Sequence, residues 1–155
     1  MSSTAADAFV PHDFDIPQGL SEEGFRLEPL HPRHNEADHA AWMSSIEHIR
    51  ATPGFEKHDW PPVAGMSAAE NLSDLQKHAD DFERRDGFTY SVLDDQDEVV
   101  GCVYIYPVNS GTEQAQVRSW VSADRADLDD PVYEAVSDWL ELVWPFDQVR
   151  YRPTT

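Results

Sequence analysis

The sequence contains little cysteine and little lysine. Cys102 is the single cysteine among 155 residues, so no disulfide can form within the chain, which favours a reducing compartment such as the cytoplasm. Only Lys57 and Lys77 are lysines, and 30 acidic residues stand against 11 basic ones, for a formal net charge of −19. Because nucleic acids and anionic membranes are bound by basic surfaces, this composition argues against both classes of partner.

Long apolar runs and common catalytic motifs are also absent. No run approaches the ~20 apolar residues that cross a bilayer. The N-terminus has no basic segment followed by an apolar run, so no secretory signal is expected. The sequence contains no phosphate-binding glycine loop, hydrolase nucleophile motif or paired cysteines of a zinc site. Hydrophobic residues make up 40% of the sequence and aromatic residues 11%, which is enough for one globular domain with its own core.

The excess of acidic residues has two interpretations. It is a common means of keeping a protein soluble, for example in a salty cell. It also attracts cations, so a cationic amine substrate is the second interpretation. The composition fits both.

The clearest pattern lies in the second half of the chain. Residues 98–107 are dense in β-forming side chains without polar alternation, which predicts a central strand covered on both faces. Gly101 within it permits a close backbone approach or a bulge. After a turn at Asn109–Thr112, residues 114–123 alternate between two faces and predict the next strand.

A helix is predicted over residues 129–143. Asp129 or Asp130 caps its N-terminus, and Pro131 suits its first turn. Its apolar residues recur at helical spacing and form one stripe that should lie on the sheet. They are Val132, Ala135, Val136, Trp139, Leu140 and Val143. A short strand over residues 148–151 follows.

The first half of the chain predicts two more strands and a helix. Residues 25–30 alternate and predict a first strand, which the proline near its end places at the edge of the sheet. Residues 35–49 predict a helix. Residues 88–93 predict a strand, which the turn at residues 94–97 joins to the central strand.

A second helix follows a loop rich in proline and glycine at residues 51–64. Ser67 and Glu70 form a capping box, and the helix runs to about Arg85, where Gly87 terminates it. Trp60 in the loop is either the lid of a pocket or an aromatic residue that plugs the edge of the core.

The N-terminal residues 1–20 have no clear periodicity and are expected to form a flexible arm. Four apolar residues would let this arm pack on the domain or on a second subunit. They are Phe9, Val10, Phe14 and Ile16. Residues 21–155 then form a single domain.

The predicted order of elements defines an α+β fold. Its sheet is mixed and mostly antiparallel, with helices on both faces. This order resembles the GNAT superfamily of acetyl-coenzyme A-dependent N-acetyltransferases. Three short phrases carry the resemblance, which extends from Gly24 to Tyr151. They are the opening Phe25–Leu30, Asp97–Gly101 at the head of the central strand, and Trp120–Asp124 at the end of the next.

The resemblance implies an enzyme that transfers an acetyl group from acetyl-CoA to a small amine. The cofactor would insert where the strand ending near Val121 splays from the last strand, and the Val121 N–H would polarise the thioester carbonyl. The following segment, with Ser122, Ala123 and Arg125, would hold the rest of the cofactor, including its pyrophosphate.

This sequence departs from the family in two respects. The glycines of the pyrophosphate loop are missing, and Asp127, Asp129 and Asp130 stand where phosphates would lie, which costs about 1–4 kcal/mol for each carboxylate before salt screening. The family also continues past its last matched strand with a helix and two strands, and that helix often supplies a tyrosine as general acid. The alternative function is therefore a GNAT-derived binding or assembly module that no longer uses coenzyme A.

Several residues are candidates for the remaining roles. Tyr133 or Tyr151 would replace the missing tyrosine as general acid, and Glu113 is either a general base or a solvated turn carboxylate. The substrate pocket is predicted from Trp60, Arg118 and Trp120. A second subunit, giving a homodimer, or the N-terminal arm would cover the sheet edge beside residues 148–151.

No metal site is predicted. His34 and Asp38 lie four residues apart, together with His31 and His39, but their spacing matches no zinc pattern. A helix start with solvated histidines explains them better. Cys102 is expected to be a buried, unreactive cysteine.

Overall fold

The computed structural model describes residues 8–56, 60–108 and 113–152, so the predicted turn at 109–112 lies outside the described part. These residues form a six-stranded sheet in the order β1-β2-β3-β4-β5-β6. Neighbouring strands are antiparallel, except that β5 and β6 are parallel. The strands are β1 Leu20–Glu22, β2 Phe25–Pro29, β3 Phe88–Asp94, β4 Val99–Pro107, β5 Ala115–Val121 and β6 Val149–Tyr151.

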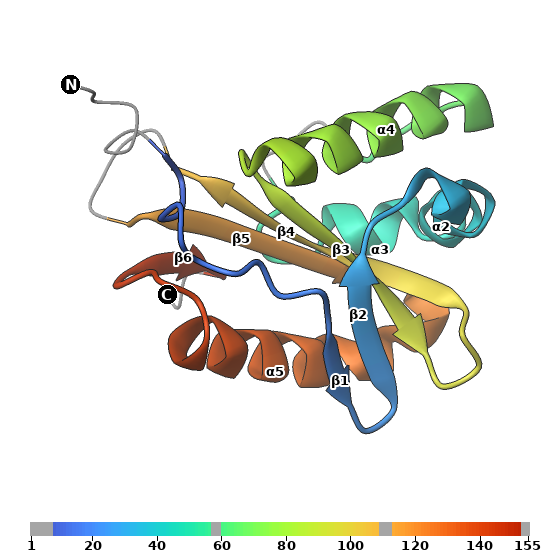
Figure 1. Ribbon diagram of the computed structural model, residues 1–155. Helices are drawn as coiled ribbons and strands as arrows, with labels where there is room; N and C mark the ends of the chain where they lie inside the picture. The colour runs from blue at the N-terminus through green and yellow to red at the C-terminus, as the bar shows by residue number, and fades with distance from the viewer. Residues whose placement is uncertain (1–7, 57–59, 109–112, 153–155) are drawn as a thin grey trace.

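Helices cover both faces of this sheet, which confirms the predicted α+β architecture (Figure 1). Helices α2, α3 and α4 lie on one face, and α5 lies on the other. The helices are α2 Asn35–Met43, α3 Ile46–Arg50, α4 Ala68–Arg84 and α5 Asp129–Leu142, with 3-10 helices η1 Pro32–His34 and η2 Ala123–Leu128. None of the helices in the described ranges is long and apolar enough to cross a membrane.

The alternating side chains of the strands divide the interior into two cores. Val117 and Val121 of β5 point toward α5 and pack with Val132 and Val136 in the larger core. Trp120, on the opposite face of β5, packs in a smaller core under the other helices. The predicted apolar stripe of α5 is therefore correct, and only its last member, Val143, is largely exposed.

Strand β1 corrects the prediction for the edge of the sheet. It pairs with β2, and β2 pairs on its other side with β3, so the strand that starts at Phe25 is not an edge strand. The three residues of β1, Leu20–Glu22, are too short to produce an alternating pattern in the sequence.

The helix predicted over residues 35–49 is interrupted by two serines. Helix α2 ends at Met43, and Ser45 between α2 and α3 has non-helical dihedral angles. The Ser44 hydroxyl donates to the carbonyl of Ala41, and the Ser45 hydroxyl accepts a hydrogen bond from the Ala123 N–H at 2.8 Å. Serine competes well for such bonds outside regular helix, so the break places the Ser45 hydroxyl on the end of β5.

Helix α4 begins with the predicted capping box, in which Ser67 and Glu70 bond to each other's backbone N–H. Its end differs from the prediction, because Arg85 and not Gly87 takes the left-handed conformation, with φ 64°. The Arg85 guanidinium donates to the carbonyls of Pro11 and Phe14. These tertiary hydrogen bonds offset the steric cost of a left-handed arginine.

The described part of the N-terminal segment packs on the sheet. Val10 is 2% exposed, and the rings of Phe9 and Phe88 are 5.8 Å apart. Phe14 and Ile16 also contact the larger core. Residues 8–20 therefore cover the face that also carries α5.

Helix α5 is preceded by η2 and is capped differently from the prediction. Leu128, in helical conformation, occupies its N-cap, and no side chain caps the helix. Asp129 stands in the first turn, where its carboxylate is bound by Arg152. The prediction of an Asp129 or Asp130 cap is therefore wrong, because η2 brings the chain into α5 without the extended residue that a side-chain cap needs.

Gly101 is expected to tolerate no side chain, since a Cβ there would lie 2.2 Å from the Trp120 carbonyl oxygen on β5. We expect Gly101→Ala to lower the free energy of unfolding by about 1–3 kcal/mol, the usual cost of overpacking, as measured by urea denaturation. Gly24→Ala is the control, because a Cβ at Gly24 meets nothing within 4 Å and leaves only backbone strain. Equal losses in both variants would contradict the close contact of β4 and β5.

Candidate functional site

A cavity of about 610 Å³ lies on the face of the sheet that carries α2 and α4. Residues of α4 line it on one side, residues of β4 and β5 form its floor, and Phe55, Trp60, Pro62 and Met66 line it from the segments between α3 and α4. Most of its surface is apolar and aromatic, and a few charged groups reach it. The aromatic lining residues are Phe55, Trp60, Tyr104 and Tyr106, and the charged ones are Asp38, Asp74, Lys77 and Arg118.

Trp60, the aromatic residue of the loop, contacts both the cavity and the smaller core. It lines the cavity, and its ring also packs 5.3 Å from Trp42 and 6.0 Å from Trp120, measured between ring centroids. Arg118 of β5 also lines the cavity, with its guanidinium 5.8 Å from the centre of the Phe55 ring. The structure thus brings the predicted pocket residues Trp60 and Arg118 to one cavity.

Trp120 lies beneath the cavity and does not line it. Its side chain is fully buried, at 0% exposure. Its indole Nε1 donates to the hydroxyl of Tyr104 at 2.9 Å, and Tyr104 does line the cavity. Trp120 therefore supports Trp60 and Tyr104 from below.

Asp38 of α2 borders the cavity and is 3% exposed. Its carboxylate accepts hydrogen bonds from Asn71 Nδ2 at 3.0 Å and from Cys102 Sγ at 3.3 Å. Burial raises the pKa of Asp38, and these hydrogen bonds oppose that shift only in part. Burial also raises the pKa of the Cys102 thiol, so Cys102 is a buried neutral donor, as predicted.

His78 of α4 lines the same cavity and is fixed by the sheet. Its Nδ1 lies 2.8 Å from Tyr106 Oη and 3.3 Å from Thr89 Oγ1. Tyr106 donates its proton to the carboxylate of Asp81, so Nδ1 carries the hydrogen and donates it to Tyr106. Burial lowers the pKa of His78 to about 4, so near pH 7 the ring is neutral and Nε2 is a hydrogen-bond acceptor.

A second feature lies at the end of β5, where β6 parts from it. Strand β6 pairs with β5 only from Ala115 to Val117, and β5 continues to Val121. The Ser122 N–H donates to the Val100 carbonyl on β4. Since backbone groups alternate along an antiparallel strand, the Val121 N–H points away from β4. It lies on the edge of β5 that β6 leaves unpaired beyond Val117, and this unpaired edge is called the gap.

The other predicted cofactor residues are already engaged. The Ser122 N–H is bonded to β4, the Ala123 N–H donates to the Ser45 hydroxyl, and the Arg125 N–H donates to the Ser122 carbonyl. The Arg125 guanidinium forms an ion pair with Asp94 at 2.7 Å. Of the four residues, Val121 alone has its N–H directed at the gap.

Arg152 follows β6 and bridges this gap. Its guanidinium donates to both oxygens of Asp129 in the first turn of α5, each at 2.7 Å, and to the Ser119 carbonyl at 3.3 Å. The Tyr151 and Ser119 hydroxyls are 2.5 Å apart. Arg152 Nε is buried and has no hydrogen-bond partner among the described residues.

The two predicted catalytic residues lie outside the large cavity. Glu113 precedes β5 at the end opposite to Val121, where it forms an ion pair with Arg150 at 3.1 Å. Tyr133 lies on α5, with its ring 4.7 Å from Tyr151 and 5.2 Å from the guanidinium carbon of Arg152. It lines a smaller cavity of about 270 Å³ between α5 and β6. Tyr133 is therefore close to the gap, and Glu113 is not.

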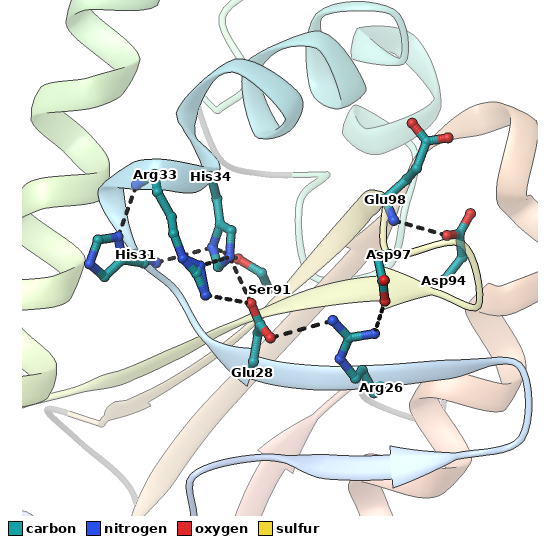
Figure 2. A network of polar contacts seen from close by, with 9 residues as sticks. All are labelled: Arg26, Glu28, His31, Arg33, His34, Ser91, Asp94, Asp97 and Glu98. Carbon is teal, nitrogen blue, oxygen red and sulfur yellow. Dashed lines mark hydrogen bonds and ion pairs between the residues drawn. The ribbon is translucent and has the colours of Figure 1, made fainter.

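His31 and His34 have structural partners (Figure 2). The prediction of solvated histidines is wrong for His34, which is 6% exposed because η1 packs on β2 and β3. His34 Nε2 lies 2.9 Å from Glu28, and its Nδ1 accepts from the His31 N–H. Ser91 contacts the same Nδ1 at 3.0 Å, so His34 joins η1 to β2 and β3. Burial lowers the pKa of His34 even though Glu28 opposes the shift. Within the described residues, no three histidine, cysteine or acidic side chains are placed to hold a metal ion.

The fold occurs in solved acetyltransferases. The ribosomal-protein-S5-alanine acetyltransferase from Vibrio fischeri matches with a TM-score of 0.60 and 13% identity, over 81% of this chain and 67% of that one. The microcin C7 self-immunity acetyltransferase MccE, solved with acetyl-CoA and AMP, matches at 0.63 and 13%, over 81% and 66%. RimL, a ribosomal L7/L12 α-N-protein acetyltransferase solved with coenzyme A, matches at 0.61 and 16%, over 81% and 65%.

This chain therefore has the GNAT fold, as the sequence predicts. It spans about two thirds of the length of these neighbours. No model of a protein family matches the sequence, and a search of curated proteins finds no match. The likeness is one of fold, and the chemistry has to be argued from the two features described above.

Proposed function

We propose that this chain is an N-acetyltransferase that transfers an acetyl group from acetyl-CoA to a small amine. The observation that carries the proposal is that β5 borders both features of the site. Its Arg118 lines the large cavity, and three residues later its Val121 lies on the edge that β6 leaves unpaired. The amine would occupy the cavity, and the cofactor would occupy the gap.

The residues around the gap fit a thioester carbonyl and a phosphate in part. The Val121 N–H lies on this side of β5, and a positioned backbone N–H stabilises a developing oxyanion. Arg152 Nε is a buried donor nearby that has no hydrogen-bond partner among the described residues. Acetyl-CoA, when bound, supplies an activated acyl carbon. The Arg152 pair with Asp129 has to open or shift to admit the cofactor, and Tyr133 beside it is the proposed proton donor.

The cavity supplies what the amine needs. An amine is protonated in water, so it reaches the site as a cation, which the net charge of −19 attracts. To act as a nucleophile it has to lose a proton, and a neutral acceptor in the cavity assists that loss. We assign this role to His78 Nε2 in preference to Glu113, because His78 lines the cavity and Glu113 does not.

A binding module without coenzyme A is the second candidate. It is favoured by the engaged N–H groups of Ser122, Ala123 and Arg125. It is also favoured by the acidic residues around the first turn of α5, because carboxylates repel a diphosphate. A homodimer through the β6 edge and a cytoplasmic location belong to the proposal in either case.

Calorimetry with acetyl-CoA separates the two candidates. For the enzyme we expect a Kd on the order of micromolar, and Asp129→Asn should tighten binding roughly tenfold, or about 1.4 kcal/mol, because it removes a negative charge and releases Arg152. Asp138→Asn is the matched control, since Asp138 is an exposed carboxylate on the same helix. If neither the wild type nor Asp129→Asn releases or absorbs heat at millimolar acetyl-CoA, the enzyme is refuted and the binding module is the function that remains.

A further inference from the structure

The large cavity contains a carboxylate that no cation of the described chain neutralises. Asp38 is almost completely buried, yet the structure shows no lysine, arginine or histidine of the described ranges within ion-pair distance of it. Its partners are the Asn71 amide and the Cys102 thiol. Buried carboxylates are usually paired with a positive group, so a cationic ligand would complete this site.

The other charged groups of the cavity are directed elsewhere. The Lys77 ammonium lies 3.0 Å from Asp81, and the Arg118 guanidinium lies over the Phe55 ring. His78 is neutral near pH 7, so it adds no positive charge. Asp74 also lines the cavity, but its side chain is exposed at the rim. The deepest acceptor for a cation is therefore Asp38.

The walls of the cavity favour an aromatic body for such a ligand. Phe55 and Trp60 face each other at 6.1 Å between ring centroids, and Tyr104 lies 6.4 Å from Phe55. Aromatic side chains bind rings through stacked or edge-on contacts and also attract cations. A volume of about 610 Å³ is within the usual range for small-molecule sites.

We propose that this cavity binds a small aromatic primary amine as its cation, with the ammonium on Asp38 and the ring against Phe55 and Trp60. Hydrogen bonds hold the carboxylate in place, because Asn71 also accepts from the Trp42 indole and donates to Asn35. The acceptor nitrogen of His78 is a second partner for an N–H of the ligand. This inference specifies the class of amine that the proposed enzyme would acetylate. Binding of the amine does not depend on the proposed function, whereas its acetylation does.

The test is calorimetric binding of phenethylammonium in the absence of acetyl-CoA. Phenylacetate keeps the ring and reverses the charge, and butylammonium keeps the charge without the ring. We expect a Kd on the order of 100 µM for phenethylammonium and at least tenfold weaker binding of the other two. Because the net charge attracts any cation, the titrations are done at about 0.5 M salt, which screens long-range attraction. Equal binding of either control compound would overturn the proposal.

Two variants locate the ammonium. Asp38→Asn keeps the shape and can still accept from Asn71, and it should weaken phenethylammonium binding at least tenfold. Asp74→Asn removes a charge from the rim of the same cavity and should change the affinity less than threefold. Circular dichroism checks that both variants are folded. The opposite order of effects would place the cation at the rim and contradict a buried site.

The pH dependence of binding gives an independent readout if Asp38→Asn does not fold. The ligand binds the ionised carboxylate, so in the wild type the affinity should fall up to tenfold per pH unit below the raised pKa of Asp38. The groups that face Asp38 are His39 on its own helix, Asn71 and Asp74 on α4, and Cys102 and Tyr104 on β4. A constant affinity from pH 8 down to the usual pKa of an aspartate would contradict the assignment.

The outcomes also separate this inference from the proposed function. Binding of phenethylammonium that depends on Asp38, without acetyl transfer, supports the site and refutes the enzyme. Acetyl transfer to amines that have no ring, with no binding of phenethylammonium, refutes the site and supports the enzyme.

Discussion

Replacing Trp120 with alanine is expected to lower the free energy of unfolding by about 3–5 kcal/mol, as for other buried tryptophans. The side chain is fully buried and donates to Tyr104, so the variant loses apolar contacts and leaves a buried hydroxyl with one partner fewer. For a chain of this length the melting temperature should fall by about 6–20 °C. Thermal and urea unfolding measure both quantities.

Trp60→Ala is the matched control, because Trp60 lines the cavity and is only partly buried. Trp60→Ala should lower the free energy of unfolding by about half as much as Trp120→Ala or less. Its loss in free energy of amine binding should exceed its loss in free energy of unfolding. If Trp120→Ala does not fold, Trp120→Phe is a milder truncation that should also lower the free energy of unfolding, by a smaller amount. Equal stability losses for Trp60→Ala and Trp120→Ala would contradict the division into a lining and a supporting tryptophan.

Acid is expected to destabilise the wild-type protein more than a His78→Gln variant. Burial lowers the pKa of His78 to about 4, and the unfolded value is about 6.5. Above pH 6.5 neither state binds the proton. As the pH falls from 6.5 to about 4, the imidazole binds a proton in the unfolded chain but not in the folded chain, so unfolding is favoured. The loss reaches about 3 kcal/mol near pH 4 and stays constant below it.

The measurement is urea unfolding of both proteins at several pH values between 7 and 4. The other titrating groups are common to both, so the difference between the two curves reports His78. Glutamine at this position retains a group able to donate to Tyr106. An NMR titration of the imidazole in the wild type gives the pKa directly, and a midpoint above 6.5 would refute the buried neutral state.

The elements of the fold were largely predictable because their signals are local. The stripe that includes Val132 and Val136 defines α5, and Ser67 with Glu70 defines the start of α4. The sequence gives no such signal for β1, which has three residues. It also gives none for the left-handed Arg85, whose conformation depends on carbonyls more than 70 positions away in the chain.

The predicted site residues that the structure places at the site are Trp60 of the loop before α4 and residues of β5. Arg118, Trp120 and Val121 belong to β5, and alternation assigns each of them a face. Asp38 and His78 come from two helices that are distant in sequence, and their chemistry arises from burial that no spacing reveals. His78 stands at helical spacing between Leu75 and Phe82, which is only a weak signal in the sequence, and Arg152 with its bond to Asp129 gives no signal.

The short pairing of β6 affects where the sheet opens locally. Five strands form a continuous antiparallel series, but β6 is attached by three residues in parallel register and by the side chains around Arg152. Amide hydrogens of this last strand should therefore exchange with solvent earlier than those of β3 and β4, whose neighbours flank them on both sides. A local opening at this end would widen the space beside Val121 at little cost, while the rest of the sheet keeps its hydrogen bonds.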